Sequence, residues 1–180
     1  MKVLIVLYDG FTEFEYVIPL MALHYVGIPF EVVGLEGREI TGMTGLKAFA
    51  EKTLGEVDPQ DYQALFLPGV DREKREVVLQ NPALLELIRK FDQEGKLIAA
   101  ICMAPVFLGA AGVLKGRRFT SSSPGHPSFE GAHWEDEPAV RDGNLITGKG
   151  ERVFHFTALL LEALAGEEKA EGYRRWAGIA

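Results

Sequence analysis

A short apolar run that ends at the chain's single cysteine constrains the fold more than any other segment. Leu97–Ile101 (LIAAI) is too short for a helix and follows Gly95-Lys96, which is typical of a buried parallel strand. Beyond Cys102, apolar residues recur at helical spacing, and Pro105 falls in the first turn, where its missing N–H costs little. The pattern therefore predicts that Cys102 lies at a sharp turn from a central strand into a helix.

The neighbours of Cys102 are small, as such a turn requires. Ala100 and Ala104 stand two residues to either side, in the positions that glycines hold around the serine of a nucleophile elbow. A turn of this kind exposes the sulfur at the carboxyl end of the sheet and near a helix N-terminus, which favours the thiolate. The alternative is a buried structural cysteine that acts as a small hydrophobe.

The rest of the chain predicts strands that alternate with helices, and hence a mostly parallel α/β sheet covered on both faces. We expect one domain over residues 1–180, because this length suits a single core. Thr12 and Glu15 predict a capping box at the first helix, and Asn81 predicts the cap of a later one. The expected strands are 2–8, 30–35, 64–67, 97–101, 119–122 and 144–147, with a small hairpin or an irregular edge within 37–49 and two final helices at 151–165 and 167–176.

Charge and cysteine content narrow the class of protein. The formal net charge of −7 argues against nucleic acid as a partner. We expect no membrane span, because no apolar run is long enough. A single cysteine allows no internal disulfide, which predicts a cytoplasmic protein.

Candidate site residues follow three strands whose carboxyl ends meet at one edge of the predicted sheet. Glu15 follows the first strand, and a pocket there would raise its pKa; protonated, it would donate to a thiolate at Cys102. Alternatively, Glu15 is a surface residue that favours the helix N-terminus. For an oxyanion, the N–H of Met103 is one expected donor, and Gly69 or Val70 supplies the second.

A proton carrier is less clearly marked. His126 and His133 lie after the strand 119–122, which we expect beside the cysteine's strand, and either is a candidate general base or a loop histidine with a local hydrogen bond. Their spacing with Glu130 and Asp136 matches no compact metal motif, so we expect neither a metal nor another cofactor.

Three motifs resemble the ThiJ/PfpI superfamily across nearly the whole chain. They are Asp9–Glu15 with Ile18-Pro19, Ala99–Pro105 followed by Ala111–Thr120, and Asp142–Gly150. The resemblance implies a flavodoxin-like three-layer sandwich, related to class I glutamine amidotransferases, and a homodimer. It also implies that Cys102 is the elbow nucleophile, that Glu15 is the acid in contact with it, and that Gly69 lies in the oxyanion loop.

The chain departs from the family pattern at three places. Peptidase-like members carry His directly after the cysteine, where this chain has Met103. Many relatives have a second Gly where this chain has Val70. Hydratase-like members have His soon after the Arg-Arg-x-Thr segment, whereas Ser121–Ser123 intervene here and His126 follows from a longer loop.

The resemblance favours a cysteine-dependent enzyme on small carbonyl or acyl substrates, of glyoxalase or deglycase type, because such a reaction needs only a thiolate and an acid. One alternative is a non-catalytic redox or stress-response protein whose cysteine is oxidised. Another is an intracellular cysteine peptidase of the PfpI type. The substrate itself is not decodable from the sequence.

Overall fold

A seven-stranded sheet forms the centre of the computed structural model, which describes residues 2–179. Its strand order is β10-β11-β7-β6-β1-β2-β5, and every pair is parallel except β10 with β11. The strands are β1 (Lys2–Leu7), β2 (Phe30–Gly34), β5 (Lys52–Thr53), β6 (Tyr62–Leu67), β7 (Leu97–Ile101), β10 (Ala139–Asp142) and β11 (Leu145–Gly148). The predicted, mostly parallel α/β sheet is confirmed.

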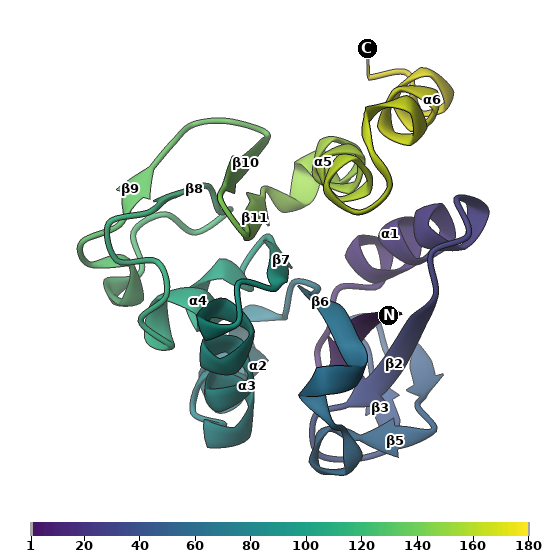
Figure 1. Ribbon diagram of the computed structural model, residues 1–180. Coiled ribbons are helices and arrows are strands. Elements are labelled where there is room, and N and C mark those ends of the chain that lie inside the picture. Colours follow the sequence, from purple (N-terminus) through teal and green to yellow (C-terminus); the bar gives the residue numbers. More distant parts are fainter. Residues whose placement is uncertain (1, 180) are drawn as a thin grey trace.

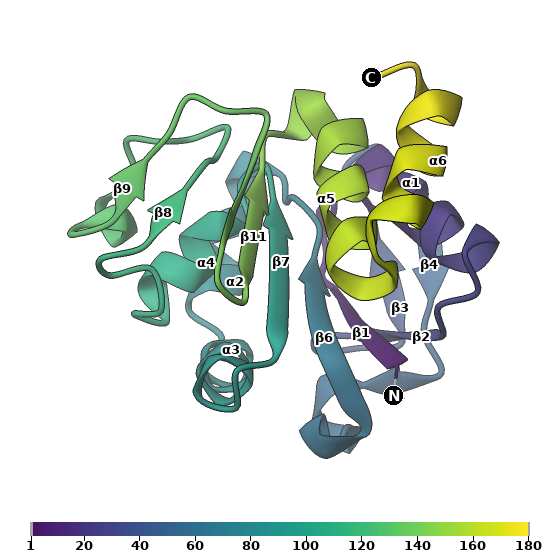
Figure 2. The ribbon, with the colours of Figure 1, turned by 45° about the horizontal axis from the view of Figure 1, so that its top comes forward.

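Helices cover both faces of this sheet, which makes a three-layer sandwich (Figures 1 and 2). One face carries α1 (Glu13–Tyr25), α5 (Val153–Ala165) and α6 (Glu167–Ala177). The other face carries α2 (Arg72–Leu79), α3 (Pro82–Gln93) and α4 (Pro105–Ala110). None of the helices within residues 2–179 is both long and apolar enough to cross a bilayer.

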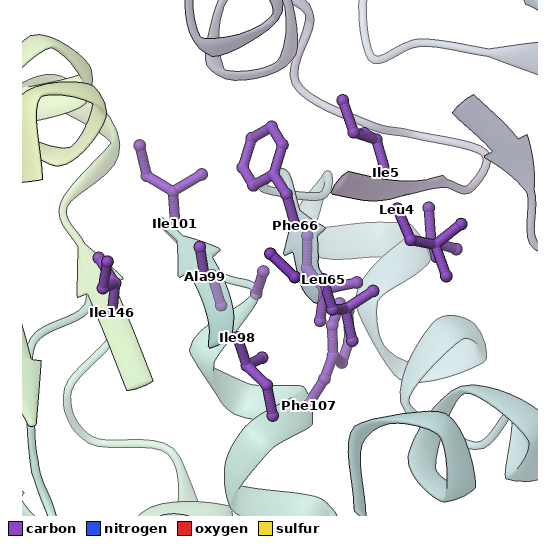
Figure 3. Close-up of a cluster of buried hydrophobic side chains, with 14 of the residues drawn as sticks. Leu4, Ile5, Leu65, Phe66, Ile98, Ala99, Ile101, Phe107 and Ile146 are labelled. Atoms are coloured by element: carbon purple, nitrogen blue, oxygen red, sulfur yellow. The ribbon is translucent and has the colours of Figure 1, made fainter. Parts of the chain in front are cut away.

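The core consists of two apolar layers, one on each face of the central strands. Successive side chains of a strand point to opposite faces, so Leu65 and Phe66 of β6 point apart in Figure 3. Leu4, Leu65 and Ile98 are paired across β1, β6 and β7, and all are fully buried. On the other face, Phe66 packs against Phe156 of α5 with ring centroids 5.8 Å apart. Burial on both faces explains why these strands read as continuous apolar runs.

Most predicted elements are confirmed, including the hairpin of β3 (Glu39–Thr41) and β4 (Lys47–Phe49). Asn81 caps α3 through Oδ1, which accepts from the N–H groups of Ala83 and Leu84. The antiparallel edge strand β10 was not expected from the sequence. Short 3₁₀ turns occupy Leu54–Glu56, Pro59–Asp61, Pro127–Phe129 and Gly150–Arg152.

The strand expected at residues 119–122 is wrong in both its extent and its neighbours. The chain forms only β8 (Arg118–Phe119), which pairs with β9 (His133–Trp134) in a separate two-stranded sheet. The place beside β7 belongs to β11 instead. Residues 120–122 still pass close to β7 and β11, because the N–H of Thr120 donates to Oγ1 of Thr147. This difference decides which side chains can reach Cys102.

A cluster of ion pairs joins β2 to its neighbouring strands β1 and β5, and its contribution to stability can be tested. Glu31 on β2 contacts Lys2, and its other oxygen lies 2.7 Å from Nζ of Lys52. The Lys2 and Lys52 ammonium groups hold the pKa of Glu31 at about 2. Stability from this carboxylate is therefore present above the unfolded-state pKa of about 4.5 and is lost as pH falls towards 2.

We expect Glu31→Gln to lower the free energy of unfolding at pH 7 by about 1 kcal/mol, a figure reduced because both lysines are partly exposed. Urea unfolding at pH 7 and pH 3 measures the difference, which should shrink at the lower pH. Glu168→Gln on α6 is the control, since that carboxylate is exposed. An equal loss at both pH values would contradict the assignment of the stabilisation to charge.

Candidate active site

Cys102 occupies a strained turn between β7 and α4. Its φ is +63°, the only positive value at a non-glycine residue among residues 2–179. The N–H of Cys102 donates to the carbonyl of Gly148 (2.8 Å), and its carbonyl accepts from the N–H of Ser122 (3.0 Å) and Oγ of Ser121 (2.7 Å). Three hydrogen bonds from two other segments therefore hold the strained conformation, as is typical of functional turns.

The thiol of Cys102 is half-buried and resists ionisation. Burial, and next the nearby Glu15 carboxylate, raise its pKa to about 12, although the Ser122 hydroxyl and the Met103 N–H favour the thiolate. The expected stabilisation by a helix N-terminus is outweighed, because α4 begins only at Pro105 and is six residues long. The sulfur therefore needs a proton acceptor before it can react as a thiolate.

Glu15 lies directly beside this thiol. It is the third residue of α1 and only 1% exposed, so the α1 helix directs a carboxyl group into the interior. Burial raises its pKa to about 7, although the Cys102 thiol, the Gly69 N–H and the Thr12 hydroxyl favour the charged form. Its Oε2 has no hydrogen bond of ordinary geometry within residues 2–179.

The expected capping box at α1 is wrong. Thr12 is the N-cap residue, but its side chain makes no cap hydrogen bond. Glu15, the other expected member of the box, points towards Cys102 instead. Glu13, on the same turn, accepts from the N–H and the hydroxyl of Thr44 at 2.7 Å each. Two glutamates two residues apart thus have separate roles: Glu13 holds the hairpin loop and Glu15 faces the sulfur.

Two glycines make room for the Cys102–Glu15 pair. A Cβ atom at Gly69 would collide with Oε2 of Glu15, and one at Gly150 would collide with its Oε1. The same added atom at Gly150 would stand 2.9 Å from Sγ of Cys102. The sequence pointed to Gly69 through the Pro-Gly turn after β6, whereas Gly150 was not singled out.

The two expected oxyanion donors flank the pair. The Met103 N–H lies close enough to the sulfur to favour the thiolate. The Gly69 N–H faces the carboxylate of Glu15 in the ligand-free protein. The carbonyl of Gly69 accepts from the N–H of Thr12 (2.9 Å), which fixes the loop against α1. Val70 forms a β-bridge with Phe11 and is buried, so it supports the loop from behind.

Neither loop histidine makes a hydrogen bond to Cys102 within residues 2–179. His126 caps the Pro127–Phe129 turn, where Nδ1 accepts from the N–H of Ser128 (3.2 Å), and its Nε2 lies 3.7 Å from Oε1 of Glu76 on α2. His133 is exposed on β9. Their loop follows β8, which does not neighbour β7, so the strand expected to carry them there is absent, and a proton-carrying role for His126 or His133 stays a prediction. Within residues 2–179 no three His, Cys, Asp or Glu side chains are grouped as metal ligands would be.

Four residues near the sulfur were missed by the sequence analysis. Ser121 and Ser122 hold the cysteine's carbonyl, and the Ser122 hydroxyl accepts from the N–H of Gly150 (2.9 Å). Glu151 lies 3.3 Å from that hydroxyl. Tyr8, at the end of β1, donates to the carbonyl of Pro68, and burial raises its pKa well above the usual value. Their position in the sequence could have indicated them, because each of these residues follows a strand end or a glycine.

This arrangement can move one proton between a sulfur and a carboxylate. Because Cys102 and Glu15 are close and buried, they titrate as a coupled pair. When the proton lies on Glu15, the repulsion on the thiolate disappears and the carboxyl group can donate to the sulfur. A nucleophile beside its own proton acceptor is the arrangement used in covalent catalysis.

The chain is similar to known proteins both in sequence and in fold. The sequence model described as the DJ-1/PfpI family matches residues 1–163. A deglycase of Thermococcus kodakarensis is 36% identical over 151 residues, which cover 83% of this chain and 90% of that protein. The protein dj-1beta of Drosophila melanogaster is 31% identical over 172 residues, covering 93% and 91%. Its crystal structure has a TM-score of 0.88 and 30% identity and covers the whole of both chains. A DJ-1 superfamily protein of Salmonella typhimurium superposes with a TM-score of 0.87 at 31% identity, over 99% of this chain and 98% of that one.

Proposed function

Because the chain belongs to the DJ-1/PfpI family, we propose that it is a cysteine-dependent enzyme acting on small carbonyl or acyl compounds by a glyoxalase- or deglycase-like reaction. The observation that carries the proposal is the strained Cys102, whose sulfur lies against the buried carboxyl group of Glu15. The Thermococcus relative that is named a deglycase supports an enzymatic role.

The first chemical step follows from this pair. The Glu15 carboxylate accepts the thiol proton, and the sulfur forms a bond to the carbonyl carbon while the C=O electron pair moves to oxygen. The oxyanion then recovers the proton from Glu15, which leaves a neutral thiohemiacetal. We propose that the Met103 N–H donates to this oxyanion and that the Gly69 N–H does so once Glu15 is protonated, which is supported by the contact of Met103 with the sulfur and of Gly69 with the Glu15 carboxylate. No histidine is required.

Turnover of a small aldehyde tests the proposal directly. We expect the wild-type protein to convert a methylglyoxal-type dicarbonyl into a hydroxy acid. NMR of the product measures this conversion. Absence of consumption above the buffer rate, in protein whose thiol is verified as reduced by mass, would reject the function.

The redox alternative has its own supporting observation. The half-buried sulfur has donors in Ser122, Met103 and a protonated Glu15, which would also stabilise a sulfinate. Intact-mass measurement after mild peroxide treatment tests it, and a product with two added oxygen atoms would support it. A PfpI-type peptidase is less well supported, because Met103 replaces the adjacent histidine and neither His126 nor His133 contacts the sulfur.

We also propose a homodimer, as the sequence resemblance implies. Light scattering during gel filtration measures the mass of the assembly in solution.

A further inference from the structure

Glu151 is an exposed carboxylate that is linked to the cysteine turn through Ser122. It belongs to the 3₁₀ turn Gly150–Arg152, which follows β11, and its side chain is exposed. The Ser122 hydroxyl accepts from the N–H of Gly150 over 2.9 Å and lies 3.3 Å from Oε2 of Glu151, so its single proton is shared between this carboxylate and the Cys102 sulfur. Ser122 also donates its own N–H to the carbonyl of Cys102. The carboxylate is thus tied to the cysteine turn through one side chain.

Glu151 also directly follows a residue that lies close to the reacting sulfur. Gly150 touches the sulfur so closely that an added Cβ would stand 2.9 Å from Sγ, and Glu151 is the next residue. The charge of Glu151 is also felt by Glu15, where it helps to keep the carboxyl group protonated. A second negative charge therefore acts within the site, on its exposed side.

The two acidic groups of the site have the same sign. Glu15 lies beside the sulfur on α1, and the charge of Glu151, on the turn after β11, acts on Glu15. Lys149, beside this turn, is paired with Asp136 instead. Arg152, the next residue after Glu151, makes no ion pair with it in the part of the chain that the structure describes. The Glu151 carboxylate, on the residue after Gly150, therefore has no ion pair with a cation among residues 2–179.

We propose that Glu151, held by Ser122, is a specificity-determining residue that makes Cys102 accept uncharged or cationic carbonyl compounds and reject anionic ones such as 2-oxo acids. This inference rests on the proposed function for its substrate class. Its physical basis is repulsion: a substrate carboxylate near Glu151 would meet a like charge at short range, and at 4 Å in water such a contact changes a rate by about fivefold.

Alkylation of the single cysteine tests this without any turnover. Iodoacetamide is neutral and iodoacetate is an anion, and in both reactions the sulfur displaces iodide while the thiol proton goes to solvent. We expect the wild-type ratio of the two rates to exceed that of free glutathione at the same pH. Glu151→Gln should bring this ratio down about fivefold. Any change in thiol pKa alters both rates equally and leaves the ratio unaffected.

Glu168→Gln on α6 is the matched control, because it removes the same charge from an exposed position on a distant helix. An unchanged ratio in Glu151→Gln, or an equal change in Glu168→Gln, would overturn the inference. A parallel arm compares kcat/KM for methylglyoxal with that for glyoxylate, and Glu151→Gln should raise the relative value for glyoxylate.

The outcomes separate the two proposals. If neither carbonyl compound reacts but the alkylation ratio still falls in Glu151→Gln, the proposed function is rejected and charge selection at Cys102 stands. If both compounds react with an unaltered preference in Glu151→Gln, the function stands and the role of Glu151 is rejected.

Discussion

Replacement of Cys102 by alanine should reduce turnover of small aldehydes by about a thousandfold or more, to the rate in buffer. The physical reason is that the sulfur forms the bond to the carbonyl carbon, and the sequence contains no second thiol to take its place. Cys102→Ser is the matched variant, because it keeps the size and a hydroxyl proton yet is a far weaker nucleophile at neutral pH. Both variants are assayed by NMR with the same dicarbonyl.

The strain at this position gives a control for correct folding. A φ of +63° is costly for alanine, serine and cysteine but not for glycine. We therefore expect Cys102→Gly to be inactive while its free energy of unfolding rises by about 1 kcal/mol relative to Cys102→Ala. An inactive protein that is more stable shows that lost activity does not reflect unfolding. Residual turnover near the wild-type rate in any of the three variants would contradict the assignment of Cys102 as nucleophile.

Replacement of Glu15 by glutamine should make stability less sensitive to pH. Burial raises the folded-state pKa of Glu15 to about 7, above the unfolded value of about 4.5. In the wild-type protein, the stabilisation that comes from the bound proton is therefore fully present below pH 4.5 and is lost as pH rises through 7. For a pKa shift of this size, the free energy of unfolding falls by about 3 kcal/mol in total. Glutamine does not titrate, so the Tm of Glu15→Gln should gain on that of the wild type between pH 4.5 and 8.

Glu13→Gln is the control for this experiment, because hydrogen bonds from Thr44 lower the pKa of Glu13. The wild type should gain on that variant as pH rises, which is the opposite sign. The thiol gives a second measurement: removal of the Glu15 charge should lower the pKa of Cys102, followed by the pH dependence of iodoacetamide alkylation. Parallel Tm profiles for wild type and Glu15→Gln, with an unmoved alkylation profile, would show that Glu15 is ionised at all these pH values and does not share the proton.

The strand–turn–helix at Cys102 was predictable because its signals are local. An apolar run of five residues, alanines on either side of the cysteine and a proline at the helix start require no knowledge of distant segments. The same holds for Asn81 at the start of α3. Glu15 was placed correctly at the carboxyl edge, but the competing local pattern of a capping box with Thr12 proved wrong, since burial against Cys102 directs the carboxyl group inward.

The prediction of a strand at residues 119–122 beside β7 failed because it depended on strand order. His126 and His133 were expected beside Cys102 because residues 119–122 were assigned to the strand next to β7. Periodicity identifies a strand but says nothing about its neighbours, and β11 takes this place with a better apolar match to β7. The histidines consequently lie with β8, β9 and α2.

The amino-acid sequence by itself determined the layered α/β fold, the sharp strand-to-helix turn at the one cysteine and the acid that follows the first strand, because each depends on patterns within a few residues. The tertiary structure alone decided the chemical state of the site. Burial raises the pKa values of both Cys102 and Glu15, and the Ser122 hydroxyl lies between the sulfur and the Glu151 carboxylate in the hydrogen-bond network. Desolvation and charge at a site are set by segments that meet only when β7 and β11 pair, and no local pattern carries that information.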